Sequence, residues 1–434
     1  MDVQKHISRI RRIDSYRYLG KIDKVIGMMI ESVGPDCKVG ELCKIYNQGF
    51  NGYINAEVVG FRGNKVLLMP YEEAEGISPG DLVEPTNTLL KINISEDLIG
   101  RVINATGEPI DGKGPIKAKV GYEVQSVSSN PLDRPRIKDV LEFGIKAIDG
   151  LLTIGKGQRI GIFSGSGVGK STLMGMIARN VKADVNVIAL VGERGREVRE
   201  FLERDLGEEG LKRSVLVVAT SDQPPMQRMK CALTATTIAE YFKDMGNDVL
   251  LMMDSLTRFA MAQREIGLAS GEPPIARGYT PSIYSSMPKL LERTGNFETG
   301  SITGIYTVLV EGDDVNEPIS DTVRGIIDGH IVLSRKIAMR NHYPAIDVLG
   351  SVSRLMTDIV SEEQLEIAGQ MRDLIAIYDQ NYDLINIGAY KSGTNLKLDY
   401  AIERIDRINS FLQQKVDEKV DFQDSIEMMK AAIA

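Results

Sequence analysis

The hydrophobic and polar positions divide the chain into three stretches with different periods. Residues 1–90 contain, after an initial helical pattern, short apolar runs such as YINAEVVGF and KVLLMP, separated by turn residues; this predicts a small β-barrel. In residues 91–345, continuous apolar runs alternate with helical patterns, which predicts a parallel sheet with helices on both faces. In residues 346–434, LEIAGQMRDLIAIY and LDYAIERIDRINSFL repeat with the 3.6-residue period of amphipathic helices, and the capping-box spacing of Ser361 and Gln364 predicts where the first of them begins. We therefore expect an α/β chain of three domains with these boundaries.

The first dozen residues predict a separate element. Val3, Ile7 and Ile10 share one face at helical spacing, and the remaining surface is largely basic, with Lys5, Arg9, Arg11 and Arg12. Two interpretations of this amphipathic helix stay open. It packs on the barrel of its own chain, or it docks on a partner or on an acidic membrane surface.

Composition narrows the classes of partner. The chain has 60 acidic and 52 basic residues, a net charge of -8, which disfavours attraction to nucleic acid. Apolar runs long enough for a membrane span are absent, and the first residues lack the apolar core of a signal peptide, so we expect a cytoplasmic protein. The three cysteines, Cys37, Cys43 and Cys231, are odd in number and lack metal-ligand spacing, which argues against a disulfide framework or a zinc site.

The strongest chemical motif is SGSGVGKST, at residues 164–172, between the apolar run RIGIF and the helical pattern LMGMIARN. A strand, a glycine-rich turn and a helix together form a phosphate-binding loop, in which backbone N–H groups point at phosphate oxygens. Lys170 would add its charge at the β and γ phosphates, and the Ser171 hydroxyl would bind magnesium. The predicted nucleotide-binding residues are Gly165, Ser166, Gly167, Val168, Gly169, Lys170, Ser171 and Thr172. Ser164 replaces the first glycine of the consensus, and a small residue should still fit there.

Two acidic residues follow other apolar runs and should meet this loop. Asp254 ends VLLMMD, which places its carboxylate at the carboxyl edge of the sheet, where a second ligand of the magnesium shell is required. Glu193 ends another predicted strand, at VGERGREVREF, and is a candidate for orienting the attacking water. A solvated charge is the alternative for Glu193, because Arg194, Arg196 and Glu197 surround it.

Taken together, GSGVGKST, GERGREVREF, SDQPPMQRMKCALTATTIAEYF, DSLTRFAMAQREIGLASGEPP and YPAIDVLGSVSR resemble, in order and over the whole chain, the rotary and type III export ATPases. The resemblance implies an N-terminal β-barrel, a RecA-like P-loop nucleotide domain and a C-terminal helical domain. It also implies ATP and Mg²⁺ as ligands, and a ring of six copies with nucleotide sites between neighbours.

Within this superfamily, GERGREV and IGAYKSGTNLKLD are similar to the type III export ATPases, and we favour the flagellar branch. That branch implies ATP hydrolysis that energises protein export by releasing or unfolding cargo from chaperones. Three alternatives stay open: the catalytic subunit of an ion-coupled ATP synthase, a virulence-type secretion ATPase, and a regulatory subunit that binds nucleotide without hydrolysing it. The related RNA-binding hexamer Rho is disfavoured by the charge balance.

The resemblance also suggests roles for single residues. Glu193 resembles the glutamate that polarises the attacking water, and Arg194 and Arg258 resemble arginines near the phosphates. Tyr343, in HYPAID, stands where the family stacks a tyrosine on adenine. Arg354, in SVSR, resembles the arginine finger that reaches a neighbour's γ-phosphate. The alternatives are a salt-bridge network for Arg194 and Arg258 and a core aromatic for Tyr343.

The partners follow from the resemblance alone. They are a stator-type regulator on the N-terminal helix, a central stalk protein, an export gate, and complexes of export chaperones with their cargo. The same branch implies a cytoplasmic protein located peripherally at the inner face of the cytoplasmic membrane.

Overall fold

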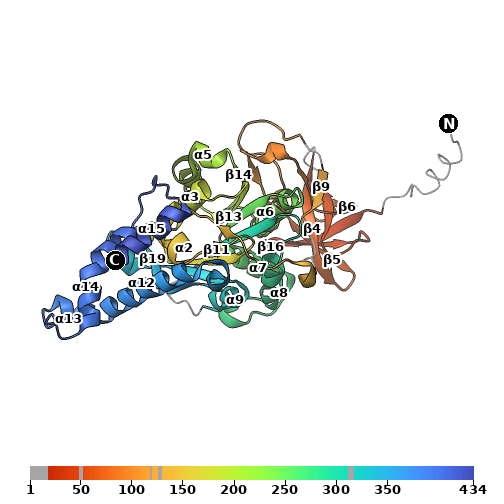
Figure 1. Ribbon diagram of the computed structural model, residues 1–434. Helices are drawn as coiled ribbons and strands as arrows, with labels where there is room; N and C mark the ends of the chain where they lie inside the picture. The colour runs from red at the N-terminus through yellow and green to blue at the C-terminus, as the bar shows by residue number, and fades with distance from the viewer. Residues whose placement is uncertain (1–17, 48–51, 118–119, 126–129, 311–316) are drawn as a thin grey trace, which may run out of the picture.

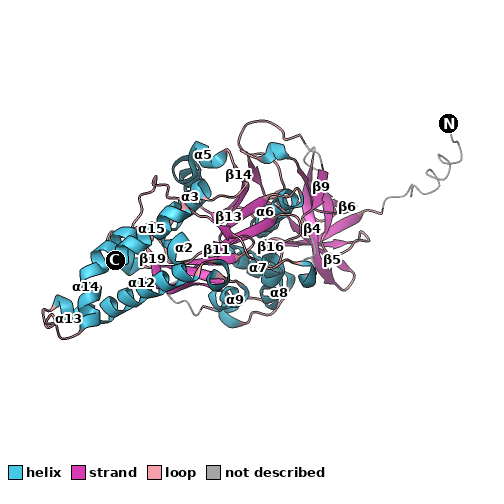
Figure 2. Cartoon of the chain, viewed as in Figure 1, coloured by secondary structure: helices cyan, strands magenta, loops and turns pink. Residues whose placement is uncertain are grey.

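The structure is a computed structural model that describes residues 18–47, 52–117, 120–125, 130–310 and 317–434. The predicted basic helix at the N-terminus lies outside the described residues. The described chain contains a β-barrel at one end, a layered α/β domain in the middle and a helical domain at the other end (Figures 1 and 2). This arrangement confirms the predicted fold class. Within the described ranges, no helix is both long and apolar enough to span a bilayer.

The barrel is closed and entirely antiparallel, in the order β1-β2-β5-β4-β3-β6. Alternate residues of its strands point inward, so that Cys43 and Ile45 on one strand and Val58 on the next are fully buried. Its strands are β1 (Gly20–Ile26), β2 (Met29–Val33), β3 (Glu41–Tyr46), β4 (Tyr53–Arg62), β5 (Lys65–Pro70) and β6 (Leu82–Leu89).

The middle domain is built on a nine-stranded sheet in the order β19-β18-β12-β17-β15-β13-β14-β8, with β16 pairing on β17. Its pairs are parallel except β18 with β19 and β16 with β17. The strands are β8 (Val102–Asn104), β12 (Arg159–Ser164), β13 (Val185–Glu193), β14 (Ser214–Thr220), β15 (Asp248–Asp254), β16 (Gly295–Asn296), β17 (Ser301–Leu309), β18 (Gly329–Leu333) and β19 (Ile346–Ser353). Two small ribbons precede it, β7 (Lys91–Ile94) with β9 (Val120–Glu123) and β10 (Val140–Leu141) with β11 (Ile154–Gly155).

Both faces of this sheet are buried, which explains why its strands are continuous apolar runs. On β13, Val187 and Ala189 belong to one core and Ile188 and Leu190 to the other. The first core also contains residues of α6 (Pro225–Asp244), α7 (Leu256–Ser270), α8 (Pro281–Leu291) and α9 (Pro318–Ile326). The second contains residues of α2 (Lys146–Leu151), α3 (Lys170–Asn180) and α11 (Met356–Ile359). Shorter helices at the edges are α4 (Gly195–Glu200), α5 (Gly207–Leu211) and α10 (Arg335–Met339), with a π-helical turn η3 (Phe201–Leu206) between α4 and α5.

The C-terminal domain consists of α12 (Glu362–Gln380), α13 (Tyr382–Asn386), α14 (Leu396–Leu412) and α15 (Phe422–Ile433). The predicted start of α12 is confirmed, because the Ser361 side chain accepts a hydrogen bond from the Gln364 N–H. The Gln364 side chain does not complete a capping box. Instead its Nε2 donates to the Asp149 carbonyl and to Thr153 Oγ1, which fastens α12 to the end of α2.

The edge strand β19 crosses the sheet in the direction opposite to its neighbours. Ile346 pairs with Leu333 at the carboxyl edge, and Ser353 pairs with Gly329 at the opposite edge. This strand begins directly after residue 345, where we placed the end of the nucleotide domain, and it joins that domain's sheet. The domain boundaries themselves stay predictions.

Candidate functional site

The glycine-rich loop connects β12 to α3 at the carboxyl edge of the sheet. β12 ends at Ser164 and α3 begins at Lys170. Gly167 and Gly169 have φ angles of 77° and 90°, in the left-handed region that favours glycine. The first N–H groups of α3 have no partner within the helix and carry its positive dipole end, so the loop is suited to bind an anion.

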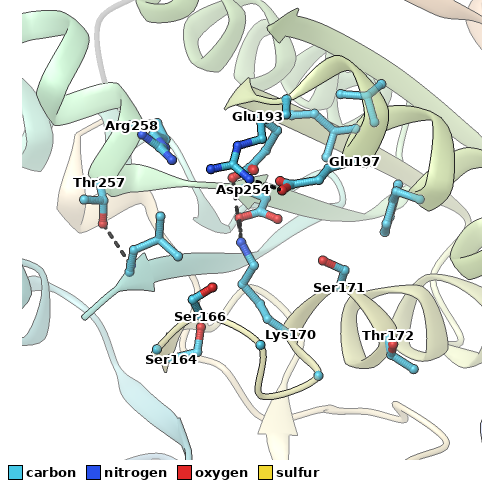
Figure 3. Close-up of a pocket in the computed structure, with 18 of the residues that line it drawn as sticks. Ser164, Ser166, Lys170, Ser171, Thr172, Glu193, Glu197, Asp254, Thr257 and Arg258 are labelled. Atoms are coloured by element: carbon cyan, nitrogen blue, oxygen red, sulfur yellow. Dashed lines mark hydrogen bonds and ion pairs between the residues drawn. The ribbon is translucent and has the colours of Figure 1, made fainter. Parts of the chain in front are cut away.

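Three charged side chains meet above this loop, Lys170 from the start of α3 and Glu193 and Asp254 from the ends of two strands. Lys170 Nζ lies 2.5 Å from Asp254 Oδ1 and 3.7 Å from Glu193 Oε1. Figure 3 shows the lysine reaching from the loop toward Asp254, with Glu193 beside it. They meet because β13 and β15 are adjacent parallel strands and end at the same edge as β12.

The electrostatics of this cluster suit a polyanionic ligand. Burial lowers the pKa of Lys170, but the charges of Asp254 and Glu193 outweigh burial and raise it, so the lysine is a cation. Burial, followed by the charge of Asp254, raises the pKa of Glu193 to about 7 against the opposing effect of Lys170. Glu193 can therefore gain or lose a proton near neutral pH, a property that suits a general base.

A cavity of about 600 Å³ lies over the loop and these three charges. Three buried atoms of residues that line it, Ser164 Oγ, Glu193 Oε1 and Arg258 Nε, make no hydrogen bond in the structure. Leaving such a group unsatisfied costs about 1–3 kcal/mol, so their common location points to a polar ligand. The donor set fits Mg²⁺ as well, because the exposed Ser171 hydroxyl and the Asp254 carboxylate supply the oxygen ligands that this ion prefers.

The structure brings most of the predicted site residues to this cavity. Val168 is an exception, because its side chain is 2% exposed and packs in the core, which leaves its backbone N–H as the group available to a ligand. The predicted residues that line the cavity are Gly165, Ser166, Gly167, Gly169, Lys170, Ser171, Thr172, Glu193, Arg194, Asp254 and Arg258.

Tyr343 lies beside the loop, outside the cavity lining. The residue is 43% exposed, and a Cβ added to Gly169 would lie 3.5 Å from two of its ring carbons. Tyr343 therefore borders the loop and is partly open to solvent, as a residue that stacks on a flat ligand must be.

Arg354 is not brought to the site of its own chain. It is exposed, it follows the far end of β19, and its Nη2 donates to the Arg324 carbonyl at 3.2 Å. On strand β18, Gly329 lies beside this end of β19, and Leu333 lies beside the loop. These two residues are about 13 Å apart along the strand.

Thr307, which contacts Asp254, was not predicted from the sequence. Thr307 is fully buried on β17, and its Oγ1 donates to Asp254 Oδ1 at 2.6 Å, the same oxygen that Lys170 contacts. The signal was a hydroxyl in an otherwise apolar run, IYTVLVEG, whose strand neighbours the one that ends in Asp254.

Comparisons with known proteins agree with this geometry. Residues 144–353 match the nucleotide-binding domain of the ATP synthase alpha/beta family, and residues 22–87 match the β-barrel domain of the same family. Residues 360–431 match the C-terminal domain of the type III secretion ATPase EscN.

Similar proteins cover almost the whole chain. The "Flagellum-specific ATP synthase" of Bacillus subtilis is 56% identical over 98% of both chains. The "Type 3 secretion system ATPase" of Xanthomonas euvesicatoria is 48% identical over 95% of this chain and 93% of its own. Among solved structures, the assembled ATPase EscN of enteropathogenic E. coli has a TM-score of 0.91 and 46% identity, over 96% of this chain and all of its own. EscN in complex with its central stalk EscO has a TM-score of 0.89 and 45% identity, with the same coverage.

Proposed function

This chain belongs to the ATP synthase alpha/beta family, in its branch of flagellar and type III secretion ATPases, and on this premise we propose that it powers flagellar protein export. The chain is an ATPase, and the proposal is that six copies form a ring in which ATP hydrolysis releases or unfolds cargo from chaperones. The observation that carries the proposal is the cluster of Lys170, Glu193 and Asp254 over a phosphate-binding loop.

Binding begins with the loop and Lys170. In the structure, Asp254 and Glu193 hold Lys170 by charge, and the phosphates of ATP would replace these partners at Nζ. Ser171 and Asp254 would hold Mg²⁺, which when bound neutralises charge on the β and γ phosphates. The Thr307 hydroxyl, which donates to Asp254 Oδ1, would keep the carboxylate oriented after Lys170 has turned to the phosphates.

Hydrolysis requires an oriented water and charge stabilisation on the transferred phosphoryl group. Glu193, at the end of β13, would accept a hydrogen bond from the attacking water. Arg194 and Arg258, from the cavity wall, would contact phosphate oxygens. Arg354 lies too far from its own loop, so we propose that it completes the site of the neighbouring copy as an arginine finger.

We propose a homo-hexamer with a central stalk, because this fold is similar to the assembled EscN and to EscN with its stalk. A stator-type regulator, an export gate and chaperone–cargo complexes remain proposed partners, with a cytoplasmic, membrane-peripheral location. The export-type C-terminal domain favours this proposal over an ATP synthase catalytic subunit. The higher identity to the flagellar relative than to the Xanthomonas secretion ATPase favours the flagellar branch.

The test is phosphate release measured over a range of protein concentrations. If sites are completed between copies, activity per chain rises as rings assemble, with sedimentation followed in the same samples. The Lys170→Ala chain, which keeps the ring interface, is the control and stays inactive throughout. Constant activity per chain across the assembly range would contradict the ring mechanism.

A further inference from the structure

A short segment between α14 and α15 contacts the nucleotide domain directly behind Tyr343. Gln414, two residues after the end of α14, is 5% exposed, and its backbone N–H donates to the Tyr343 carbonyl at 3.0 Å. Arg340 makes a second contact with the C-terminal domain, because its guanidinium lies over the Tyr382 ring at 4.6 Å. Contacts with the C-terminal domain therefore fix the segment that contains Tyr343.

The Gln414 side chain fixes the position from which this hydrogen bond is made. Its Oε1 accepts from the Lys146 N–H at 2.8 Å, and its Nε2 donates to the Gly144 carbonyl at 2.8 Å. Nε2 also donates to the Glu418 carbonyl at 2.9 Å, while the Glu418 carboxylate pairs with Lys146 Nζ at 3.2 Å. One buried glutamine thus joins three parts of the structure: its side-chain amide contacts the beginning of α2 and the α14–α15 segment, and its backbone N–H contacts the Tyr343 carbonyl.

We propose that Gln414 is a positioning residue for nucleotide base binding. It holds the Tyr343 ring at the border of the loop. The ring is therefore in position to stack on adenine only while the end of α14 is bound to α2. This inference rests on the proposed role of Tyr343 in base stacking. The chemical consequence is selective: Gln414 affects the affinity for the base and leaves the affinity for the phosphates unchanged, because the phosphate groups contact the loop and Lys170.

A purely structural role for Gln414 is the competing explanation, and the chain offers a matched control. Gln364 is also a buried glutamine of the C-terminal domain, 3% exposed, and its amide also binds α2 and its end, at Asp149 and Thr153. It makes no hydrogen bond to Tyr343. Loss of either side-chain amide should weaken the contact between the two domains, but only loss of the Gln414 amide should change the position of the Tyr343 ring.

The experiment is calorimetric titration of the full chain with two ligands in the presence of Mg²⁺: ATP, and inorganic tripolyphosphate, which lacks the base. Since stacking of a base on an aromatic ring contributes about 1–3 kcal/mol, Tyr343→Ala should weaken ATP binding roughly 5- to 150-fold and leave tripolyphosphate binding unchanged. Gln414→Ala should shift the ratio of the two affinities in the same direction by about 2- to 12-fold, as expected for one net hydrogen bond. Gln364→Ala should leave the ratio at the wild-type value.

The outcomes separate the two hypotheses. An unchanged ratio in Gln414→Ala, or an equal change in Gln364→Ala, overturns the inference while a changed ratio in Tyr343→Ala preserves the base-stacking role. An unchanged ratio in Tyr343→Ala removes the base-stacking role itself. If Gln414→Ala does not fold, Gln414→Glu keeps the acceptor for the Lys146 N–H and loses the donor to the Gly144 and Glu418 carbonyls, and it should shift the ratio in the same direction.

Discussion

The regions at the two ends of strand β19 differ in whether this chain alone supplies all the groups of a site. Near its start, at the carboxyl edge of the sheet, Lys170, Asp254 and Glu193 are largely buried beside a cavity, and Lys170 forms an ion pair with each of the two carboxylates. Beyond its far end, Arg354 is exposed and its side chain donates to one backbone carbonyl. The same strand therefore connects a preorganised nucleotide site to an arginine that does not reach the nucleotide site of its own chain.

This contrast separates binding from turnover. The groups that bind phosphate and hold the metal come from one copy, so a single chain should bind nucleotide. In the proposed ring, Arg354 of another copy would supply charge that stabilises the transition state, so a single chain should turn over slowly. Mutations at the two ends should accordingly change different measurements.

Lys170→Ala should have the largest effect. It removes the cation of a buried cluster and leaves Asp254 and Glu193 facing each other without a counter-charge. Nucleotide binding and phosphate release should both fall below detection. Normal turnover in a folded variant, checked by circular dichroism, would contradict the assignment of the site.

Arg354→Ala should reduce turnover by about 10³ to 10⁵ without changing the ATP affinity of the single chain. Phosphate release and equilibrium binding are the two measurements. Arg354→Lys should restore little, because lysine lacks the planar fork of a guanidinium.

A mixing experiment makes this prediction sharper. Rings formed from Arg354→Ala and Lys170→Ala chains contain some interfaces with an intact loop on one side and an intact arginine on the other. Phosphate release should return in the mixture although neither variant is active alone. In mixed rings verified by mass spectrometry, continued inactivity would place the action of Arg354 within its own chain.

Glu193→Gln should keep ATP and Mg²⁺ bound and slow phosphate release by about 10² to 10⁴, because an amide has the shape of the carboxylate but does not accept the proton of water. Binding is measured by titration and hydrolysis by single-turnover kinetics. A parallel loss of affinity would assign Glu193 a role in holding Lys170 instead.

Thr307→Val should have the smallest effect. It removes the hydroxyl that orients Asp254 and keeps the shape of the buried side chain, so the Mg²⁺ concentration for half-maximal ATP binding should rise about tenfold, the cost of a hydrogen bond to a charged group. Thr307→Ser should restore the wild-type value. A change in thermal stability alone, with unchanged Mg²⁺ dependence, would limit Thr307 to packing.

The sequence predicted the three-part fold and the loop because each has a local signature. The barrel strands, the buried parallel strands and the amphipathic helices differ in period, and the loop follows an apolar run at a fixed spacing. The position of Asp254 could also be predicted, since residues that end parallel strands meet at one edge. For Glu193 the strand end alone left a solvated charge as the alternative, and the resemblance to the family decided the prediction.

The contacts between distant segments could not be predicted in this way. Thr307 contacts Asp254 because β17 and β15 are neighbours in the sheet. The order of strands in a sheet cannot be predicted from the sequence of any single strand. The hydrogen bond from Gln414 to Tyr343 joins residues about seventy positions apart, and no periodicity relates them. The capping-box pattern at Ser361 predicted the start of the helix correctly, but tertiary contacts redirected the Gln364 side chain to α2.

The antiparallel course of β19 has a mechanical consequence. The strand is eight residues long, about 25 Å, with Tyr343 shortly before it and Arg354 directly after it. Hydrogen bonds to β18 make it a stiff rod, which transmits displacement along its length better than a loop does. In the proposed ring, a change in base binding at Tyr343 of one copy would move the Arg354 that the same copy presents to its neighbour, so that the two nucleotide sites would be coupled.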